Sequence, residues 1–476
     1  MLDPVIRATA ELGAWQIISP ITEITGRLAV VDELYPIQDE VFPEPTLLLA
    51  RAVSGEEEIP QNCVGVITPD SPDVLSHISV RARNSKTLLA TCFSEDPLSD
   101  LRKLSGQPVK IATTARGDVE FWEVGEAELT AAGSSSAPQA QRSAMKIKVP
   151  VWSGKWAVGM DSFKDNIVGA KSKNLAAMRG KIPDSIGVPA SVTLPFGCYE
   201  ECLKHRLNAQ VSQEIAALLD GLKLEGADLE ATLRKCQDLA MGIKVPEALC
   251  SELSEQMGNS GIDWPEGGER WHAALSAVKN VWASQYNLRA YVSLKKAGLN
   301  FRDIRMAVLV QRMVNADYSF VIHTTNPATG DSAEIYAEVV KGLGEVLVGN
   351  YPGRAFSFTG RKDRLDEPSV EAFPSKSVGL FHSESLIFRS DSNGEDLDGY
   401  AGAGLYDSVP MDETEERPVD YFSDPLLTDA EFQHKLMLDV LKVGAAIEQS
   451  LGSPQDIEGC IDSDGRVIVV QTRPQV

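Results

Sequence analysis

The sequence lacks any apolar run near the roughly 18 residues that a membrane-spanning helix needs, so we expect no membrane partner. Cysteine is scarce: its 7 residues are scattered along 476, which excludes a disulfide-stapled fold and indicates a reducing compartment. Positive charge is also in deficit, with 45 Lys and Arg against 68 Asp and Glu and a net charge of −23. This balance excludes a broad nucleic-acid-binding surface but leaves room for a local basic pocket.

The remaining composition is that of a globular protein. Hydrophobic residues make up 43% and charged residues 24%, and the length suits about three domains of roughly 150 residues. The first residues carry neither a secretory nor a transit-peptide pattern, so we expect a fragment or a chain whose targeting segment was removed. The sequence does not indicate an oligomeric state.

One segment divides the chain. Residues 132–149 are rich in Ser, Ala and Gln and predict a flexible linker. Residues 1–131 alternate short β-rich runs with turns, whereas residues 150–476 open with a Gly/Lys loop, pass through a helical middle and close with β-rich runs. We therefore predict two globular units joined by a tether.

The helical middle contains one long amphipathic pattern. Apolar residues recur with a 3.6-residue period between Trp271 and Lys296. Trp282, Tyr286 and Leu288 are predicted to pack inward from this stretch.

His77 has the most unusual setting of the six histidines. The preceding TPDSPD has turn and cap chemistry, and a helix is predicted within VLSHISVRARN with His77 in its first turn. The helix dipole there disfavours imidazolium, and free N–H groups favour phosphate. Ser76 adds a hydroxyl donor, and Arg81 and Arg83 are placed to stabilise an anionic adduct. The alternative is a cap histidine on an ordinary surface helix; the other five histidines are interpreted as structural.

Two loops in the second unit have phosphate-binding chemistry. IVGAKSKNLAAM places Gly169 and Lys171 just before a helical pattern, although it departs from the GxxxxGK[ST] loop. LIFRSDSNGEDLDGYAGAG places Arg389 at the end of a β-run before a glycine-rich acidic turn, which suits polyphosphate recognition. A solvated acidic loop is the alternative for the second.

The C-terminal run QDIEGCIDSDGRVIVVQTRPQ predicts a hairpin. Asp456 and Glu458 lie two apart on one strand and so face the same side, and Gln471 and Arg473 alternate on the returning strand. Carboxylates beside an amide and a guanidinium suit a Mg²⁺–nucleotide. An exposed hairpin face is the alternative, but VIVVQTRP is too apolar for a strand exposed on both sides.

Together these blocks resemble a known family. SHISVRAR resembles the phosphohistidine signature of the dikinases that include phosphoenolpyruvate synthase and pyruvate phosphate dikinase. VGAKSKNL, VKGLGEVLVG, RSDSNGEDL and DIEG with VVQTRP resemble their ATP-grasp nucleotide domain. Longer blocks, such as TPDSPDVLSHISVRARN and FRSDSNGEDLDGYAGAGLYDSVPMDE, resemble the alpha-glucan water dikinases.

The resemblance implies an α+β multidomain fold with a swivelling β/β/α phosphohistidine domain followed by a two-lobed ATP-grasp domain. It implies that the β-phosphate of ATP passes through a phosphohistidine to a glucosyl hydroxyl of starch, expected at carbon six. The γ-phosphate goes to water, leaving AMP and inorganic phosphate. The implied cofactor is Mg²⁺, the partners are ATP and starch or another α-glucan, and the implied location is the plastid stroma of a chloroplast.

The resemblance also assigns roles to residues. His77 is the phosphorylated catalytic residue, supported by Ser76, Arg81 and Arg83. The other assignments are nucleotide contacts at Lys171, Glu345, Arg389, Gln471 and Arg473, and metal ligands at Asp456 and Glu458. Two alternatives stay open: a related dikinase with a different acceptor, and a non-catalytic phosphohistidine carrier.

Overall fold

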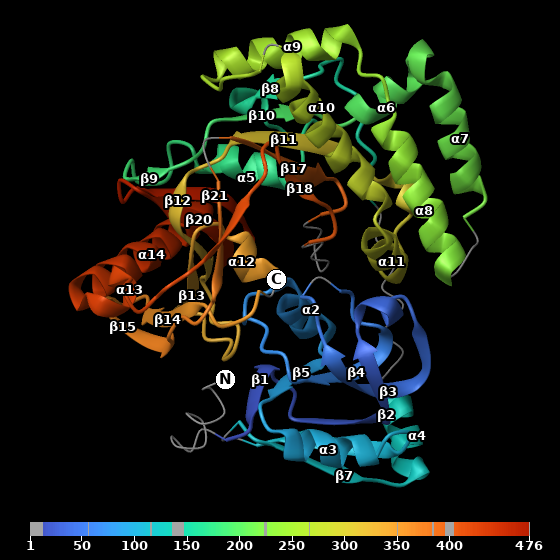
Figure 1. The fold of residues 1–476 in the computed structure, drawn as a ribbon, viewed down its shortest axis with the longest axis vertical. Helices are drawn as coiled ribbons and strands as arrows, with labels where there is room; N and C mark the ends of the chain where they lie inside the picture. The colour runs from blue at the N-terminus through green and yellow to red at the C-terminus, as the bar shows by residue number, and fades with distance from the viewer. Residues whose placement is uncertain are drawn as a thin grey trace. The chain divides into compact units, whose positions relative to one another are not determined.

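The structure is a computed structural model that describes residues 13–55, 57–114, 117–135, 147–222, 226–265, 267–349, 351–382, 385–395 and 404–475. The chain divides into two compact units. The first comprises Met1–Ala144 with Pro327–Gly330 and Leu347–Arg354, and the second comprises the rest. Both units mix helices with strands, which confirms the predicted mixed multidomain class (Figure 1).

The first unit is built on a mixed sheet in the order β1-β5-β4-β3-β2-β6-β7. The central strands β2 to β5 run parallel, and the flanking strands pair antiparallel. The strands are β1 (Trp15–Ser19), β2 (Glu23–Glu33), β3 (Val41–Ala52), β4 (Gln61–Thr68), β5 (Leu88–Cys92), β6 (Pro108–Thr113) and β7 (Val119–Glu123). The helices are α2 (His77–Ser85), α3 (Glu95–Lys103) and α4 (Glu126–Ser135).

Alternation along the central strands gives this sheet two apolar faces. Leu47 belongs to a core on one face that includes Leu98 of α3, whereas the next residue, Leu48, belongs to a core on the other face. Ile78 and Ala82 of α2 pack into that second core. The sheet therefore fixes the helix that begins at His77.

The predicted linker starts later than expected. Residues 132–135 continue helix α4 instead of forming a tether, because α4 packs against β2 and β3 and this tertiary contact outweighs the weak helix propensity of the glycine and serines at its end. Residues 136–146 lie outside the described residues.

The second unit contains three sheets, in the orders β18-β17-β11-β10-β8, β15-β14-β13-β12-β20-β21-β9 and β16-β19. Their strands are β8 (Val158–Gly159), β9 (Ile186–Gly187), β10 (Ser191–Leu194), β11 (Met306–Arg312), β12 (Ala316–His323), β13 (Glu334–Lys341), β14 (Phe356–Arg361), β15 (Arg364–Ala372), β16 (Val378–Phe381), β17 (Leu386–Ser392), β18 (Ser408–Pro410), β19 (Glu415–Pro418), β20 (Gln455–Asp462) and β21 (Val467–Pro474).

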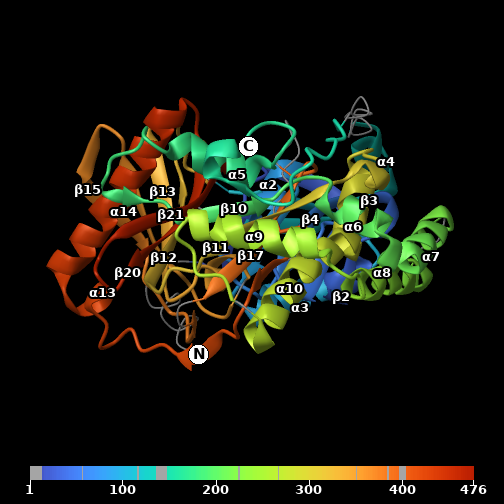
Figure 2. The ribbon, with the colours of Figure 1, turned by 90° about the horizontal axis from the view of Figure 1, so that it is seen from above.

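The helices of the second unit are α5 (Ala170–Met178), α6 (Cys198–Lys204), α7 (Ala209–Asp220), α8 (Gly226–Met241), α9 (Glu247–Asn259), α10 (Gly268–Ala283), α11 (Leu288–Lys296), α12 (Glu345–Val348), α13 (Pro425–Thr428) and α14 (Ala430–Leu451). Helix α14 lies along one face of the sheet that contains β12, β13 and β20 (Figures 1 and 2). That face is apolar: Phe320, Ile322 and Phe358 pack with Leu441 and Ile447 of the helix. The opposite face of the same strands carries polar side chains.

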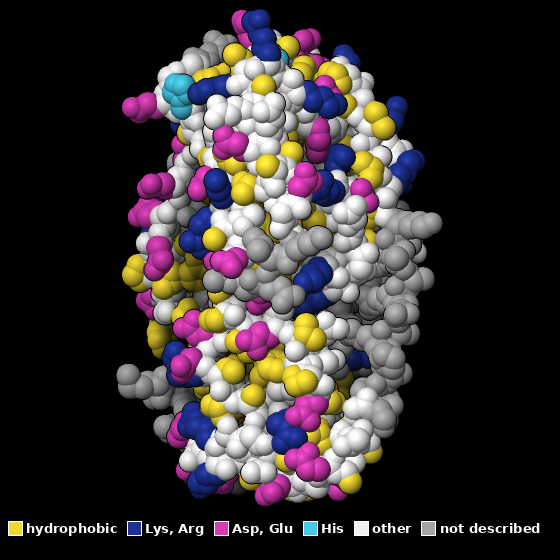
Figure 3. All heavy atoms as spheres, turned by 90° about the vertical axis from the view of Figure 1, so that its right-hand side faces the viewer, with side chains coloured by type: hydrophobic (Ala, Val, Ile, Leu, Met, Phe, Trp, Pro, Cys, Tyr) yellow, Lys and Arg dark blue, Asp and Glu magenta, His cyan; other side chains and the backbone are white. Residues whose placement is uncertain are grey.

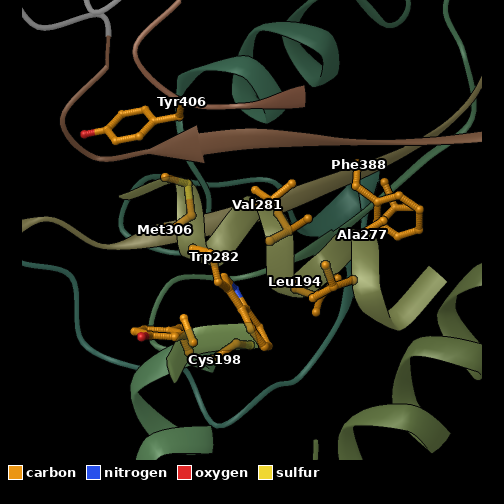
Figure 4. Close-up of a cluster of buried hydrophobic side chains, with 14 of the residues drawn as sticks. Leu194, Cys198, Ala277, Val281, Trp282, Met306, Phe388 and Tyr406 are labelled. Atoms are coloured by element: carbon orange, nitrogen blue, oxygen red, sulfur yellow. The ribbon is translucent and has the colours of Figure 1, made fainter. Parts of the chain in front are cut away.

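A second core fills the helical part of this unit. Trp282 is fully buried and lies among Leu194, Val281 and Met306 (Figure 4). Tyr286 is also buried, as predicted.

The amphipathic pattern over residues 271–296 forms two helices. The chain leaves α10 through a 3-10 turn at Ser284–Tyr286, and Leu288, which is half-buried, begins α11. Asn287 stands at the N-cap position of α11, where its residue type favours a new helix start.

The surface drawn in Figure 3 carries charges of both signs. Lys and Arg side chains are interspersed with Asp and Glu on that face. Across the described ranges, no helix combines the length and hydropathy needed to cross a membrane.

The core predicts a stability effect. Trp282→Ala should lower the free energy of unfolding by about 3–5 kcal/mol, because it removes a fully buried indole and leaves a cavity. Chemical denaturation measures this change. The control Trp122→Ala removes an indole that is 42% exposed and should change stability by about 0.5 kcal/mol or less. Equal losses for the two variants would contradict the assignment of this core.

Candidate functional site

His77 is the first residue of α2, and its side chain is half-buried. This placement agrees with the prediction of a first-turn histidine. The sequence predicted free backbone N–H groups at this helix start. One of them is not free, because the N–H of Ile78 donates to the carbonyl of Gly55 at 3.0 Å. Ser76 is fully buried, and its hydroxyl is 2.8 Å from the hydroxyl of Ser79.

The two arginines of α2 already have partners. The buried guanidinium of Arg81 donates to the carbonyl of Glu57 at 2.9 Å and pairs with Glu58 at 3.1 Å. Arg83 donates to the carbonyl of Val74 at 2.8 Å. Both side chains therefore tie α2 to neighbouring loops, and in this structure they support the helix.

A buried carboxylate occupies the N-terminus of α5. Asp391 of β17 accepts hydrogen bonds from the amides of Gly169 and Lys171, both at 2.9 Å, and from the hydroxyl of Ser172 at 2.6 Å. Burial raises the pKa of the Asp391 carboxyl, and these donors oppose that rise. A Cβ at Gly169 would overlap Asp391. The absence of a side chain at Gly169 therefore makes room for Asp391, and this carboxylate occupies the place where the loop was predicted to bind a phosphate.

Lys171 points into the same region. Its Nζ pairs with Glu395 at 2.6 Å and donates to the carbonyl of Ser390 at 2.8 Å. Both side chains are largely buried. A phosphate contact by this lysine would therefore compete with Glu395.

The predicted hairpin forms, and its register contains an irregularity after Glu458. In β20 and β21, Asp456 lies opposite Arg473, and Glu458 lies opposite Gln471. Arg473 donates to Oδ2 of Asp456 through Nε at 2.8 Å and through Nη2 at 2.6 Å. The four side chains share one face of the sheet, opposite the face covered by α14.

Arg389 links this hairpin to the sheet that contains β17. Its Nη2 donates to Glu458 at 3.0 Å and to Gln471 at 2.7 Å. Its Nη1 donates to the carbonyl of Val470 at 3.3 Å, at the register shift between the pairs 458/471 and 459/469. Its Nε is buried without a hydrogen-bond partner among the described side chains and backbone. The structure thus brings Arg389 to Glu458 and Gln471, which follow it by 69 and 82 positions in the sequence.

Asp456 is ionised in this setting. Burial alone would raise the pKa of its carboxyl, but Arg473 and His323 outweigh burial and hold that pKa well below its ordinary value. The carboxylate is therefore available as an oxygen ligand.

The carboxylates of the hairpin are candidate ligands for a divalent ion. Among the described residues, no group of three or more His, Cys, Asp or Glu side chains has metal-binding geometry. Mg²⁺ is commonly held by one or two carboxylates together with substrate phosphates. Asp456 and Glu458 on one face, with the unpartnered Nε of Arg389 beside them, fit that mode.

Glu345 is exposed at the start of the short helix α12, and no contact joins it to the hairpin residues in the described structure. The loop before it approaches the polar face, because the hydroxyl of Ser319 donates to the carbonyl of Gly342 at 2.7 Å.

Sequence reasoning missed three residues of this polar face. His323 of β12 lies opposite Asp456, and Tyr336 of β13 donates to the buried Glu338 at 2.9 Å. Alternation within EIYAEVVK places Tyr336 and Glu338 on one face, which was an available signal. His323 gave a weaker signal, as a single polar residue ending the run SFVIH.

Two protein-family profiles match the chain. Residues 14–130 match the phosphohistidine-like domain of alpha-glucan water dikinase, and residues 269–476 match the AMP/ATP-binding domain of pyruvate phosphate dikinase. The chain thus combines a phosphohistidine-like domain with a nucleotide-binding domain of the dikinase class.

Individual relatives narrow this class. The chain is 51% identical to the chloroplastic alpha-glucan water dikinase of Solanum tuberosum and 43% identical to alpha-glucan water dikinase 2 of Arabidopsis thaliana. These matches cover 100% of the chain but 32% and 36% of the relatives. The phosphoenolpyruvate synthase of Pyrococcus furiosus is 29% identical over 42% of the chain and 22% of its own length. The resemblance to the alpha-glucan water dikinases is therefore confirmed over the whole chain, which spans about a third of their length.

The Asp391 contacts generate a prediction. Gly169→Ala should lower the free energy of unfolding by about 1–3 kcal/mol, because the new Cβ displaces a buried carboxylate from the start of α5. The control Gly258→Ala lies within α9 with nothing near its Cβ, and it should be neutral or stabilising. Denaturation curves of the two variants test this, and an unaffected Gly169→Ala protein would contradict it.

Proposed function

We propose that the chain is the catalytic portion of an alpha-glucan water dikinase. The β-phosphate of ATP is transferred to His77 and then to a glucosyl hydroxyl of an α-glucan, expected at carbon six, and the γ-phosphate goes to water. The supporting observation is the cluster of Arg389, Glu458 and Gln471 in a unit that matches an AMP/ATP-binding domain.

The machinery is divided between two units. His77 begins a helix in the unit that matches the phosphohistidine-like domain, whereas the cationic and acidic groups belong to the other unit. A histidine relay divides a transfer between two separate substrates into two steps. We therefore propose a swivelling phosphohistidine domain that serves a two-lobed ATP-grasp domain, with residues 136–149 as the connection after α4.

The first step needs positioning and charge neutralisation more than covalent work by the nucleotide unit. A bond forms between a ring nitrogen of His77 and the β-phosphorus while the bond from that phosphorus to the α,β-bridging oxygen breaks, so AMP leaves and His77 carries a pyrophosphoryl group. Water then attacks the γ-phosphorus, the bond from that phosphorus to the β,γ-bridging oxygen breaks, and inorganic phosphate leaves a singly phosphorylated His77. Arg389 and Gln471 bind the phosphates, and Lys171 joins them when it leaves Glu395. Arg473 contacts the phosphate chain from its place beside Asp456.

Asp456 and Glu458 would hold the magnesium ion, which supplies charge neutralisation for the phosphate chain when bound. Arg473 keeps Asp456 ionised, and Arg389 pairs with Glu458. Glu345 is proposed as a further nucleotide contact, and Ser76, Arg81 and Arg83 as supports of the histidine helix.

In the second step, the phosphorus–nitrogen bond breaks and a glucosyl oxygen takes the phosphoryl group. The proposal rests here on relatives named alpha-glucan water dikinase. A plastid location is proposed on the same ground, because the Solanum tuberosum relative is named chloroplastic.

The relay predicts a labelled protein. Incubation with Mg²⁺ and ATP labelled at the β-phosphate should give acid-labile label on the chain, and ATP labelled at the γ-phosphate should leave none. His77→Ala should abolish this label, because it removes the nucleophile. The control His434→Ala changes an exposed ring on α14 and should label normally. Label that survives His77→Ala would contradict the relay.

Acceptors separate the alternatives. Label that moves from the protein to soluble maltodextrin supports the proposal. Label that moves only to a non-glucan acceptor indicates a different dikinase. A stably labelled protein that passes label to no acceptor indicates a carrier.

The metal assignment predicts a second effect. Asp456→Asn or Glu458→Gln should slow labelling of His77 on the order of 100-fold, because each removes a charge from the nucleotide site. Titration with Mg²⁺ should show an increased metal requirement. Asp464→Asn changes an exposed acid in the turn of the same hairpin and serves as the control. Normal labelling by both site variants would contradict the assignment.

A further inference from the structure

His323 is a buried histidine at the end of β12, only 5% exposed. Its cross-strand neighbour on one side is Asp456 of β20, and that residue pairs in turn with Arg473 of β21. The three residues therefore form one cross-strand row, histidine, aspartate and arginine, on the polar face of the sheet. The neighbouring row carries Glu458 and Gln471.

The two oxygens of Asp456 have different surroundings. Arg473 donates twice to Oδ2, whereas Nε2 of His323 lies 3.5 Å from Oδ1. Arg473 fixes the position of Oδ2 through two hydrogen bonds. The nearby imidazole of His323 restricts rotation of the carboxylate, which would move Oδ1. Because Oδ1 has the looser contact, it is the oxygen of Asp456 that remains able to bind a further cation.

Both ring nitrogens of His323 are buried, and neither makes a hydrogen bond to any described residue. The nearby Tyr336, its neighbour on β13, directs its hydroxyl to Glu338 instead. Burying a polar nitrogen without a hydrogen bond is unfavourable, and an aromatic hydrocarbon side chain would fill the same volume at lower cost. A purely structural role thus leaves an imidazole at this position unexplained.

We propose that His323 is a positioning residue of the nucleotide site, which orients Oδ1 of Asp456 through Nε2 and draws that contact in to a hydrogen bond when the site is occupied. This inference rests on the proposed function. It assigns a role to a residue that the family motifs do not include.

The experiment measures binding as well as turnover. Mn²⁺ binding to the full chain is followed by electron paramagnetic resonance with adenylyl imidodiphosphate present, and the KM for ATP and the kcat of His77 labelling are measured separately. His323→Phe removes both ring nitrogens at similar volume. His323→Gln keeps an amide donor within reach of Asp456. His434→Gln is the matched control on α14.

His323→Phe should weaken Mn²⁺ binding about 10- to 100-fold and raise the KM for ATP, because the metal-facing oxygen loses its orientation. His323→Gln should recover most of the Mn²⁺ affinity and return the KM toward that of the unmodified chain, since its amide keeps a donor for Oδ1 of Asp456. His434→Gln should match the unmodified chain.

Equal Mn²⁺ affinity in His323→Phe and the unmodified chain would overturn the inference, as would equal losses in the Phe and Gln variants. Should His323→Phe fail to fold, His323→Gln and His323→Asn decide the matter, because only the former keeps the donor toward Asp456. The unmodified chain tests the proposed function separately from the role of His323. If the unmodified chain binds the Mn²⁺ nucleotide and labels His77, the proposed function stands whatever the His323 variants do. If it does neither, the proposed function and the role of His323 are both contradicted.

Discussion

The register between β20 and β21 is the constraint on which the candidate site depends. It pairs Asp456 with Arg473 and Glu458 with Gln471 on one face of a sheet whose other face is packed under α14. Since side chains alternate along a strand, a slip of one residue would exchange the buried apolar residues with the charged ones. The apolar core therefore enforces the register, and the register sets the charge arrangement.

The same constraint explains the roles of neighbouring elements. Strand β17 delivers Arg389 to this hairpin and, two residues later, Asp391 to the start of α5. Residues of this one short strand thus contact both the hairpin and the GAKS loop, which is residues 169–172. Lys171 of that loop pairs in turn with the acidic residue Glu395. Each cation near the polar face has an acidic neighbour, so a nucleotide that binds there must compete with internal ion pairs.

Local patterns in the sequence were sufficient to predict some elements of the candidate site. The turn chemistry of TPDSPD predicted a helix start at His77, and two-residue alternation around a DSDG turn predicted a hairpin with Asp456 and Glu458 on one face. The cross-strand pairs depend on the register shift after Glu458, which alternation alone does not predict. Long-range contacts were not predictable. The bond from Gly169 to Asp391 spans 222 positions, and nothing local in GAKS distinguishes a carboxylate of the protein from a phosphate. His323 was interpreted as structural because it lacks the turn, helix and arginines that surround His77. Its neighbour Asp456 comes from a strand more than 130 residues later, so no local pattern indicated their contact.

The central claim is that the polar face of this sheet binds the magnesium nucleotide. A crystal structure of the chain with Mg²⁺ and a non-hydrolysable ATP analogue tests it most directly. The account predicts phosphate oxygens against Arg389 and Gln471 and the metal on Asp456 and Glu458. A nucleotide bound elsewhere, with the Arg473–Asp456 and Arg389–Glu458 pairs unchanged, would contradict it.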